Sequence, residues 1–126
     1  MGTIGWDMML DKPYKDRQAD AEHVRKMIGE VRKLTNKPFA INLAPRTGMN
    51  PPLLQMLVAI EEKVPVAYIS TTKPQPAVVK AMHDAGMKVM AIGTTVRHAT
   101  LAEQAGVDVF ICSGYDAGGH SPGHGD

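Results

Sequence analysis

The chain has few of the residues that would cross-link a protein by disulfides, give it a large net charge or anchor it in a bilayer. Its 126 residues include one cysteine, and its 14 lysines and arginines nearly balance its 13 aspartates and glutamates. A lone cysteine excludes an intramolecular disulfide and favours the reducing cytoplasm. Scattered basic residues build no nucleic-acid surface, and no apolar run approaches the roughly 18 residues that cross a membrane. We therefore expect a small-molecule partner, no nucleic acid and no membrane.

The apolar residues form four short runs that alternate with helical patterns. The runs cover residues 38–43, 66–70, 89–92 and 107–112, and their starts are separated by 28, 23 and 18 residues. Runs that are this short, apolar on both faces and separated by helices predict buried parallel strands with right-handed crossovers. Cys112 ends the most apolar run, so we expect a packed and inert thiol.

Punctuation residues predict where the helices between these strands begin and end. Asp20 is a candidate N-cap before the apolar stripe that runs from Ala21 to Leu34, and Thr95 is a candidate N-cap for the last helix. Gly86 and Gly106 stand where helix ends need a left-handed residue. Three histidines fall in these helical patterns, and we expect them on solvated faces: His23, His83 and His98.

Two folds place helices between parallel strands, the open doubly wound sheet and the (β/α)₈ barrel. No Gly-x-Gly-x-x-Gly motif follows a strand, which weighs against a dinucleotide-binding doubly wound sheet. A closed eight-stranded barrel typically takes about 250 residues, roughly twice the length of this chain. We therefore predict an α/β fold as one domain over residues 1–126. The order of its motifs resembles that of a barrel family, and this resemblance favours a partial (β/α)₈ TIM barrel of four to five β/α units.

The strongest candidate for chemistry is the glycine-rich segment that follows the last strand, Ser113-Gly114-Tyr115-Asp116-Ala117-Gly118-Gly119-His120. The imidazole of His120 titrates near neutrality and can move a proton. Gly118 and Gly119 carry no side chain, so a flat ligand can approach the backbone there. The alternative is a solvent-exposed histidine in a flexible turn.

Asn42 is a candidate ligand-binding residue because its amide lies inside an apolar strand, where it needs a hydrogen-bond partner. The alternative is a strand-end amide that ties down the neighbouring loop. Ser113 and Gly114 follow the last strand, at the same edge of a parallel sheet. Hydroxyls and bare backbone at that edge suit binding of a planar or anionic ligand.

A metal site is the other interpretation of the carboxyl-terminal segment. Asp116, His120, His124 and Asp126 offer oxygen and nitrogen ligands at close spacing. Two histidines four residues apart bind a metal well on a helix, but Pro122 and the neighbouring glycines oppose a helix here. We therefore expect no metal.

The sequence resembles the nitronate monooxygenase family, also called 2-nitropropane dioxygenases, and its relatives the flavin-dependent enoyl-ACP reductases. The matching motifs are the Ala-Gly-Gly-His segment, the Lys-Pro-Phe-Ala-Ile-Asn-Leu run at residues 37–43, the Lys-Val-Met-Ala-Ile-Gly run at residues 88–93, and the opening Gly-Thr-Ile-Gly. The chain departs from many members after the histidine, where Ser121-Pro122-Gly123 replaces a basic residue.

The resemblance implies a cytoplasmic FMN-dependent oxidoreductase, a flavoprotein that oxidises alkyl nitronates with O₂ to carbonyl compounds and nitrite. It implies His120 as the catalytic residue and assigns flavin contacts to Asn42, Ser113, Gly114, Gly118 and Gly119. Two alternatives remain, a flavin-dependent enoyl-ACP reductase and a truncated, non-catalytic half-barrel.

The resemblance also implies that parts of the barrel are missing, namely a first strand upstream of Gly2 and the later phosphate-binding loops. We therefore expect the chain alone to hold FMN weakly. We also expect it to need another chain, either a second copy or the remainder of the barrel, to close its sheet edges.

Overall fold

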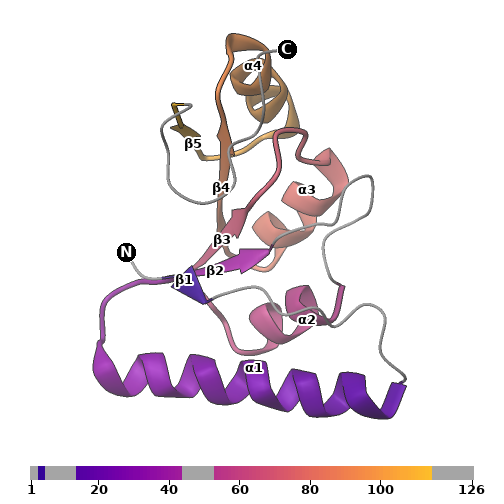
Figure 1. Ribbon diagram of the computed structural model, residues 1–126, viewed down its shortest axis with the longest axis vertical. Coiled ribbons are helices and arrows are strands. Elements are labelled where there is room, and N and C mark those ends of the chain that lie inside the picture. The colour runs from indigo at the N-terminus through magenta and orange to yellow at the C-terminus, as the bar shows by residue number, and fades with distance from the viewer. Residues whose placement is uncertain (1–2, 5–13, 44–52, 115–126) are drawn as a thin grey trace.

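The fold is built on one parallel sheet whose strands stand in sequence order. The computed structural model describes residues 3–4, 14–43 and 53–114 (Figure 1). The five strands of these segments are β1 (Thr3–Ile4), β2 (Ala40–Leu43), β3 (Val66–Ile69), β4 (Lys88–Gly93) and β5 (Val109–Cys112). Each strand pairs in parallel with the next one along the chain. A doubly wound sheet would reverse its strand order, so the unbroken order confirms the predicted partial barrel.

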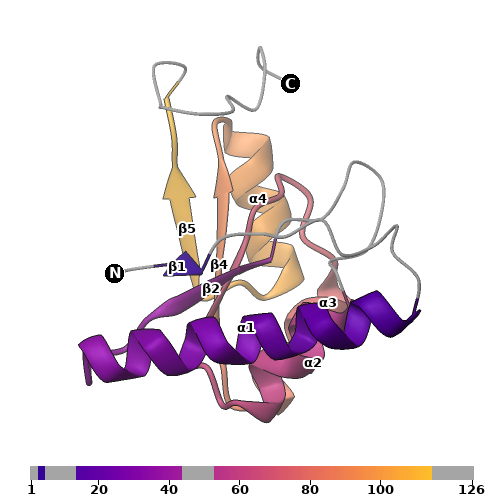
Figure 2. The same ribbon diagram turned by 60° about the horizontal axis from the view of Figure 1, so that its bottom comes forward.

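In the described segments, four helices connect the strands and lie along one side of the sheet, from α1 and α2 to α4 (Figures 1 and 2). They are α1 (Tyr14–Leu34), α2 (Leu53–Glu61), α3 (Pro76–Asp84) and α4 (Val96–Ala105). Their apolar stripes and one face of the strands enclose the core. Its largest fully buried apolar side chains are Ile28, Ile41, Leu43, Val58, Val64, Ile69, Val79, Met82 and Val89. Alternation along each strand therefore turns the next residue toward the face that bears no helix.

Three of the four predicted helix-capping residues lie at helix ends in the structure. The Thr95 hydroxyl accepts a hydrogen bond from the His98 amide at 3.2 Å, and Gly106 caps the other end of α4 with φ +88°. Gly86, after α3, is also left-handed, with φ +81°. The Asp20 cap is wrong, because α1 begins at Tyr14 and includes Asp20.

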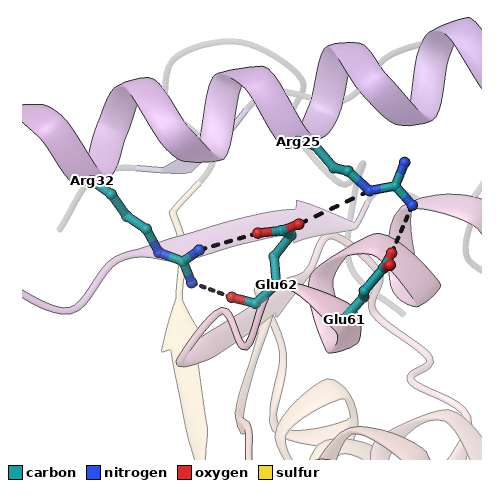
Figure 3. A network of polar contacts seen from close by, with 4 residues as sticks. All are labelled: Arg25, Arg32, Glu61 and Glu62. Carbon is teal, nitrogen blue, oxygen red and sulfur yellow. Dashed lines mark hydrogen bonds and ion pairs between the residues drawn. The ribbon is translucent and has the colours of Figure 1, made fainter.

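A polar network ties α1 to the end of α2 (Figure 3). Arg25 Nη2 lies 2.6 Å from Glu61 Oε2, and Arg32 Nη1 lies 3.3 Å from Glu62 Oε2. Arg32 also donates to the backbone carbonyl of Glu62. The hydrogen bond to Glu61 raises the pKa of Arg25 above its usual value. These side chains are 31% to 60% exposed, so each ion pair contributes little to the free energy of unfolding.

Two apolar predictions are wrong, both where the sheet or the helix stripe ends. Leu34, the last residue of the predicted stripe, is 87% exposed at the end of α1. Cys112 is exposed and not packed, because β5 is an edge strand with no neighbour beyond it in the described part of the chain.

The same segments contain no helix that is long and apolar enough to cross a membrane.

Candidate functional site

The candidate site is the edge of the sheet where the strands end. Because all pairings are parallel, the carboxyl ends of β2 to β5 lie at one edge. Asn42 is the penultimate residue of β2, Ser70 follows β3, Thr94 follows β4 and Ser113 follows β5. Backbone hydrogen bonds hold two of these positions to the preceding strand, from the Ser70 amide to the Leu43 carbonyl at 3.2 Å and from the Ser113 amide to the Gly93 carbonyl at 2.9 Å.

Asn42 and Ser70 meet at this edge. The Ser70 hydroxyl donates to Oδ1 of Asn42 at 2.6 Å, and the pair is partly buried. Asn42 pairs with Tyr68, and Ser70 lies two residues beyond Tyr68, just after β3, on the same face and diagonal to Asn42. Ile41 and Leu43, on either side, are buried in the core, which places Asn42 on the face away from the helices. The structure thus gives the oxygen of this partly buried amide a hydrogen-bond partner.

After β4, the next strand along this edge, Thr94 and His98 form a tightly packed corner between β4 and α4. The Thr94 amide donates to Nδ1 of His98 at 3.1 Å, so Nδ1 is the acceptor in this contact. His98 is 4% exposed, so the predicted solvated position is wrong. The hydroxyl oxygen Oγ1 of Thr94 is buried and has no hydrogen-bond partner among the described residues. A buried hydroxyl of this kind can still donate to a ligand.

Gly93 explains why His98 is buried. A Cβ at Gly93 would overlap Cβ of His98 and come within 3.0 Å of the Phe110 ring. Only the absence of a side chain lets α4 lie this close to the ends of β4 and β5. The sequence contains the signal, a glycine that closes an apolar strand, but the partner can be identified only from the three-dimensional arrangement.

Ser113 and Gly114 begin the glycine-rich segment at the same edge as Asn42. A Cβ at Gly114 would meet no atom within 4 Å, so the space beside this residue is open. The Ser113 hydroxyl makes a contact of 3.4 Å with the Gly114 carbonyl, which is too long to hold it firmly. Both residues therefore remain able to contact a ligand.

The other predicted site residues lie outside the described residues. His120, Gly118 and Gly119 belong to this group, as do the four residues that were weighed as metal ligands. The last described strand, β5, ends at Cys112, at the edge that also holds Asn42. The role of His120 stays a prediction.

Sequence reasoning did not identify the link between Ser70 and Asn42. In the sequence, Ser70, Thr71 and Thr72 all follow the same apolar run, and no local pattern separates Ser70 from the other two. The signal is the register of β2 on β3, which only the structure supplies.

Comparison with known proteins decides the family. The family model described as nitronate monooxygenase matches residues 45–126. The chain belongs to the nitronate monooxygenase family. Its similarity to the nitronate monooxygenase of Paraburkholderia phytofirmans is 29% identity over 80% of this chain, and to that of Pseudomonas aeruginosa 30% over 79%. The chain spans 37% and 39% of the lengths of these two relatives.

Solved structures place the chain in the same fold. FabK from Thermotoga maritima superimposes with a TM-score of 0.73 and 30% identity, over 95% of this chain and 34% of FabK. A nitroalkane oxidase from Streptomyces ansochromogenes superimposes with a TM-score of 0.72, over 84% of this chain and 39% of the oxidase. Its 23% identity supports the fold alone. The family predicted from the sequence is thereby confirmed, together with its relation to FabK.

Proposed function

We propose that this chain forms the flavin-facing part of an FMN-dependent oxidoreductase that oxidises alkyl nitronates with O₂ to carbonyl compounds and nitrite. The observation that carries the proposal is the pairing of Asn42 with Ser70 at the carboxyl edge of a sheet from the nitronate monooxygenase family. The predicted flavin contacts at Ser113 and Gly114 lie after β5, at this same edge. The chain covers less than two fifths of its curated relatives, so the proposal concerns the site that it contributes.

The side chains at this edge suit a flat, neutral ring system with acceptor atoms. Asn42, Ser70 and Thr94 are uncharged; with the Ser70 hydroxyl donating to Asn42, the donors left for a ligand are the Asn42 amide group and the Thr94 hydroxyl. Thr94 has a buried hydroxyl oxygen without a partner in the described segments, and Gly114 has open space beside it. An isoalloxazine ring carries carbonyl oxygens and ring nitrogens that accept such donors. The residues present therefore fit a flavin.

Each part of the reaction then has a separate origin. FMN would supply the redox chemistry with the nitronate and with O₂. Asn42 would bind the ring, while Ser113, Gly114, Gly118 and Gly119 would let it approach the backbone. His120 would remove a proton from the carbon next to the nitro group of a nitroalkane, or orient a nitronate that is already an anion.

A second candidate is a flavin-dependent enoyl-ACP reductase, which the 30% identity to FabK favours. The two candidates differ in their electron donor. Under exclusion of oxygen, propyl nitronate should bleach the flavin absorbance of the FMN-loaded chain, and NADH should not. Bleaching by NADH alone would replace the proposal with the reductase. A chain that takes up no FMN would support the non-catalytic half-barrel.

The role of His120 is tested by one substitution with a matched control. We expect His120→Gln to retain FMN and to lose most of the bleaching rate with nitronate. His124→Gln changes a histidine of the same segment that has no proposed role, and it should behave like the unchanged chain. Equal rates for the unchanged chain and His120→Gln would remove His120 from the chemistry.

A further inference from the structure

The pair formed by Ser70 and Asn42 has a defined polarity. The distance of 2.6 Å is ordinary for an O–H···O hydrogen bond and short for an N–H···O bond. Ser70 is therefore the donor, and the amide oxygen of Asn42 is the acceptor. Because the oxygen and the nitrogen of a carboxamide diverge from the same carbon, the Nδ2 group of Asn42 is directed away from Ser70.

Ser70 is itself held in place independently of its side chain. Its amide donates to the Leu43 carbonyl at 3.2 Å, which joins the end of β3 to the end of β2. The neighbouring Thr71 amide donates to the Ile69 carbonyl at 2.8 Å, which fixes the turn that follows. A hydroxyl on an anchored backbone can set the rotation of the Asn42 amide, which is otherwise a broad, two-fold torsion.

We infer that Ser70 is a positioning residue that fixes the Asn42 amide, so that Asn42 presents N–H donors to an acceptor edge of the bound ligand. The inference rests on the proposed function and deepens it, because it states which chemistry Asn42 recognises. For a flavin, the matching groups are the carbonyl oxygens and unprotonated ring nitrogens, and not the N3–H donor. An amide that rotates freely could bind either the acceptor groups or the N3–H donor of the flavin, because it can present its oxygen or its nitrogen to the ring.

The first test compares FMN affinity among variants by quenching of flavin fluorescence. We expect Ser70→Ala to bind FMN about three- to tenfold more weakly, the loss that corresponds to one net hydrogen bond. Ser70→Thr keeps the hydroxyl and should restore the affinity. Thr72→Ala removes a nearby hydroxyl that makes no side-chain hydrogen bond within the described residues, and it should bind FMN like the unchanged chain.

The substitution Asn42→Asp tests whether FMN binding needs the N–H donors of Asn42, or only the hydrogen bond between residue 42 and Ser70. A carboxylate can still accept from Ser70, but it offers no donor to the ring, so its affinity should fall further than that of Ser70→Ala. The role of Ser70 is overturned if Ser70→Ala binds FMN as tightly as the unchanged chain while Asn42→Asp binds it more weakly. That result would leave the proposed function intact.

A second readout needs no flavin and separates the two proposals. The ¹H–¹⁵N resonances of the Asn42 carboxamide should move in Ser70→Ala, return in Ser70→Thr and stay in place in Thr72→Ala. If the unchanged chain binds no FMN, the proposed function fails, and the Asn42 resonances alone then decide whether Ser70 holds the amide. Resonances that do not respond to Ser70→Ala would overturn the inference.

Discussion

Asp108 and His83 are joined at the amino edge of the sheet, with Nε2 of His83 2.6 Å from Oδ2 of Asp108. The same carboxylate oxygen accepts from the Val89 amide at 2.8 Å, and the Asp108 amide donates to the Val89 carbonyl at 2.9 Å. One side chain therefore joins α3 to the start of the β4–β5 pairing. This edge lies opposite the candidate site, so its contacts report on stability.

The first prediction concerns stability in acid. Burial alone would raise the pKa of Asp108, but the hydrogen bonds from His83 and the Val89 amide, with the charges of His83 and Lys88, lower it below the usual 3.8. A carboxyl whose pKa is lower in the folded state stabilises the fold fully above the unfolded pKa. That contribution is lost as the pH falls through the folded pKa.

Asp108→Asn should therefore reduce the free energy of unfolding by about 1 kcal/mol at neutral pH. It should also flatten the fall in stability between about pH 5 and about pH 3, measured by denaturant titration. Asp84→Asn is the control, because its ion pair with Lys80 is exposed and contributes about 0.3 to 0.5 kcal/mol. An unchanged acid slope in Asp108→Asn would contradict the assignment.

The second prediction concerns the corner where α4 packs on the sheet. Gly93→Ala places a methyl group against Cβ of His98 and the Phe110 ring, and should cost about 1 to 3 kcal/mol of unfolding free energy. Gly29→Ala is the matched control. It adds a methyl group inside α1 with no atom within 4 Å, and should raise stability by about 0.5 to 1 kcal/mol. Equal effects of the two substitutions would show that the corner is not tightly packed.

Local sequence patterns predicted the strands and the helix caps because these depend on neighbours in the chain. The strands β2 to β5 lie within a residue or two of the apolar runs, and Thr95, Gly86 and Gly106 have their predicted roles. The strand β1 was not among the four runs, because its two residues form no apolar run of their own.

The errors concern residues whose environment is set by distant parts of the chain. His98 is buried because Gly93 lets the helix approach, and Cys112 is exposed because β5 has an open edge among the described strands. At the site, the sequence identified Asn42 as a candidate because an amide inside an apolar strand is costly to bury without a hydrogen-bond partner. Its partner Ser70 required the register of two strands, which no local pattern contains.

The third prediction follows from the exposure of Cys112. Its thiol should react with a disulfide reagent in the native protein at a rate close to that of a small free thiol, with no denaturant present. Cys112→Ser should change the free energy of unfolding by less than about 0.5 kcal/mol. Reaction that occurs only on unfolding would show that the edge of β5 is covered in solution.

The fourth prediction separates ligand binding from folding at Gly114. A methyl group there meets no protein atom within 4 Å, and the φ of Gly114 is outside the left-handed region. Gly114→Ala should therefore leave the free energy of unfolding within about 0.5 kcal/mol of the unchanged chain. If the flavin ring lies against this backbone, the Gly114→Ala variant should bind FMN about tenfold more weakly than the unchanged chain. Unchanged affinity would remove Gly114 from the predicted contacts.

The most direct test of the flavin site is a ¹H–¹⁵N titration of the chain with FMN, because it detects even weak binding residue by residue. We predict that the resonances of Ser70, Thr94, Gly114 and the Asn42 carboxamide move in proportion to bound FMN. Those of Lys88 and Asp108, at the amino edge, should stay in place. Shifts confined to the amino edge, or no shifts at saturating FMN, would contradict the proposal that the carboxyl edge of this sheet binds a flavin.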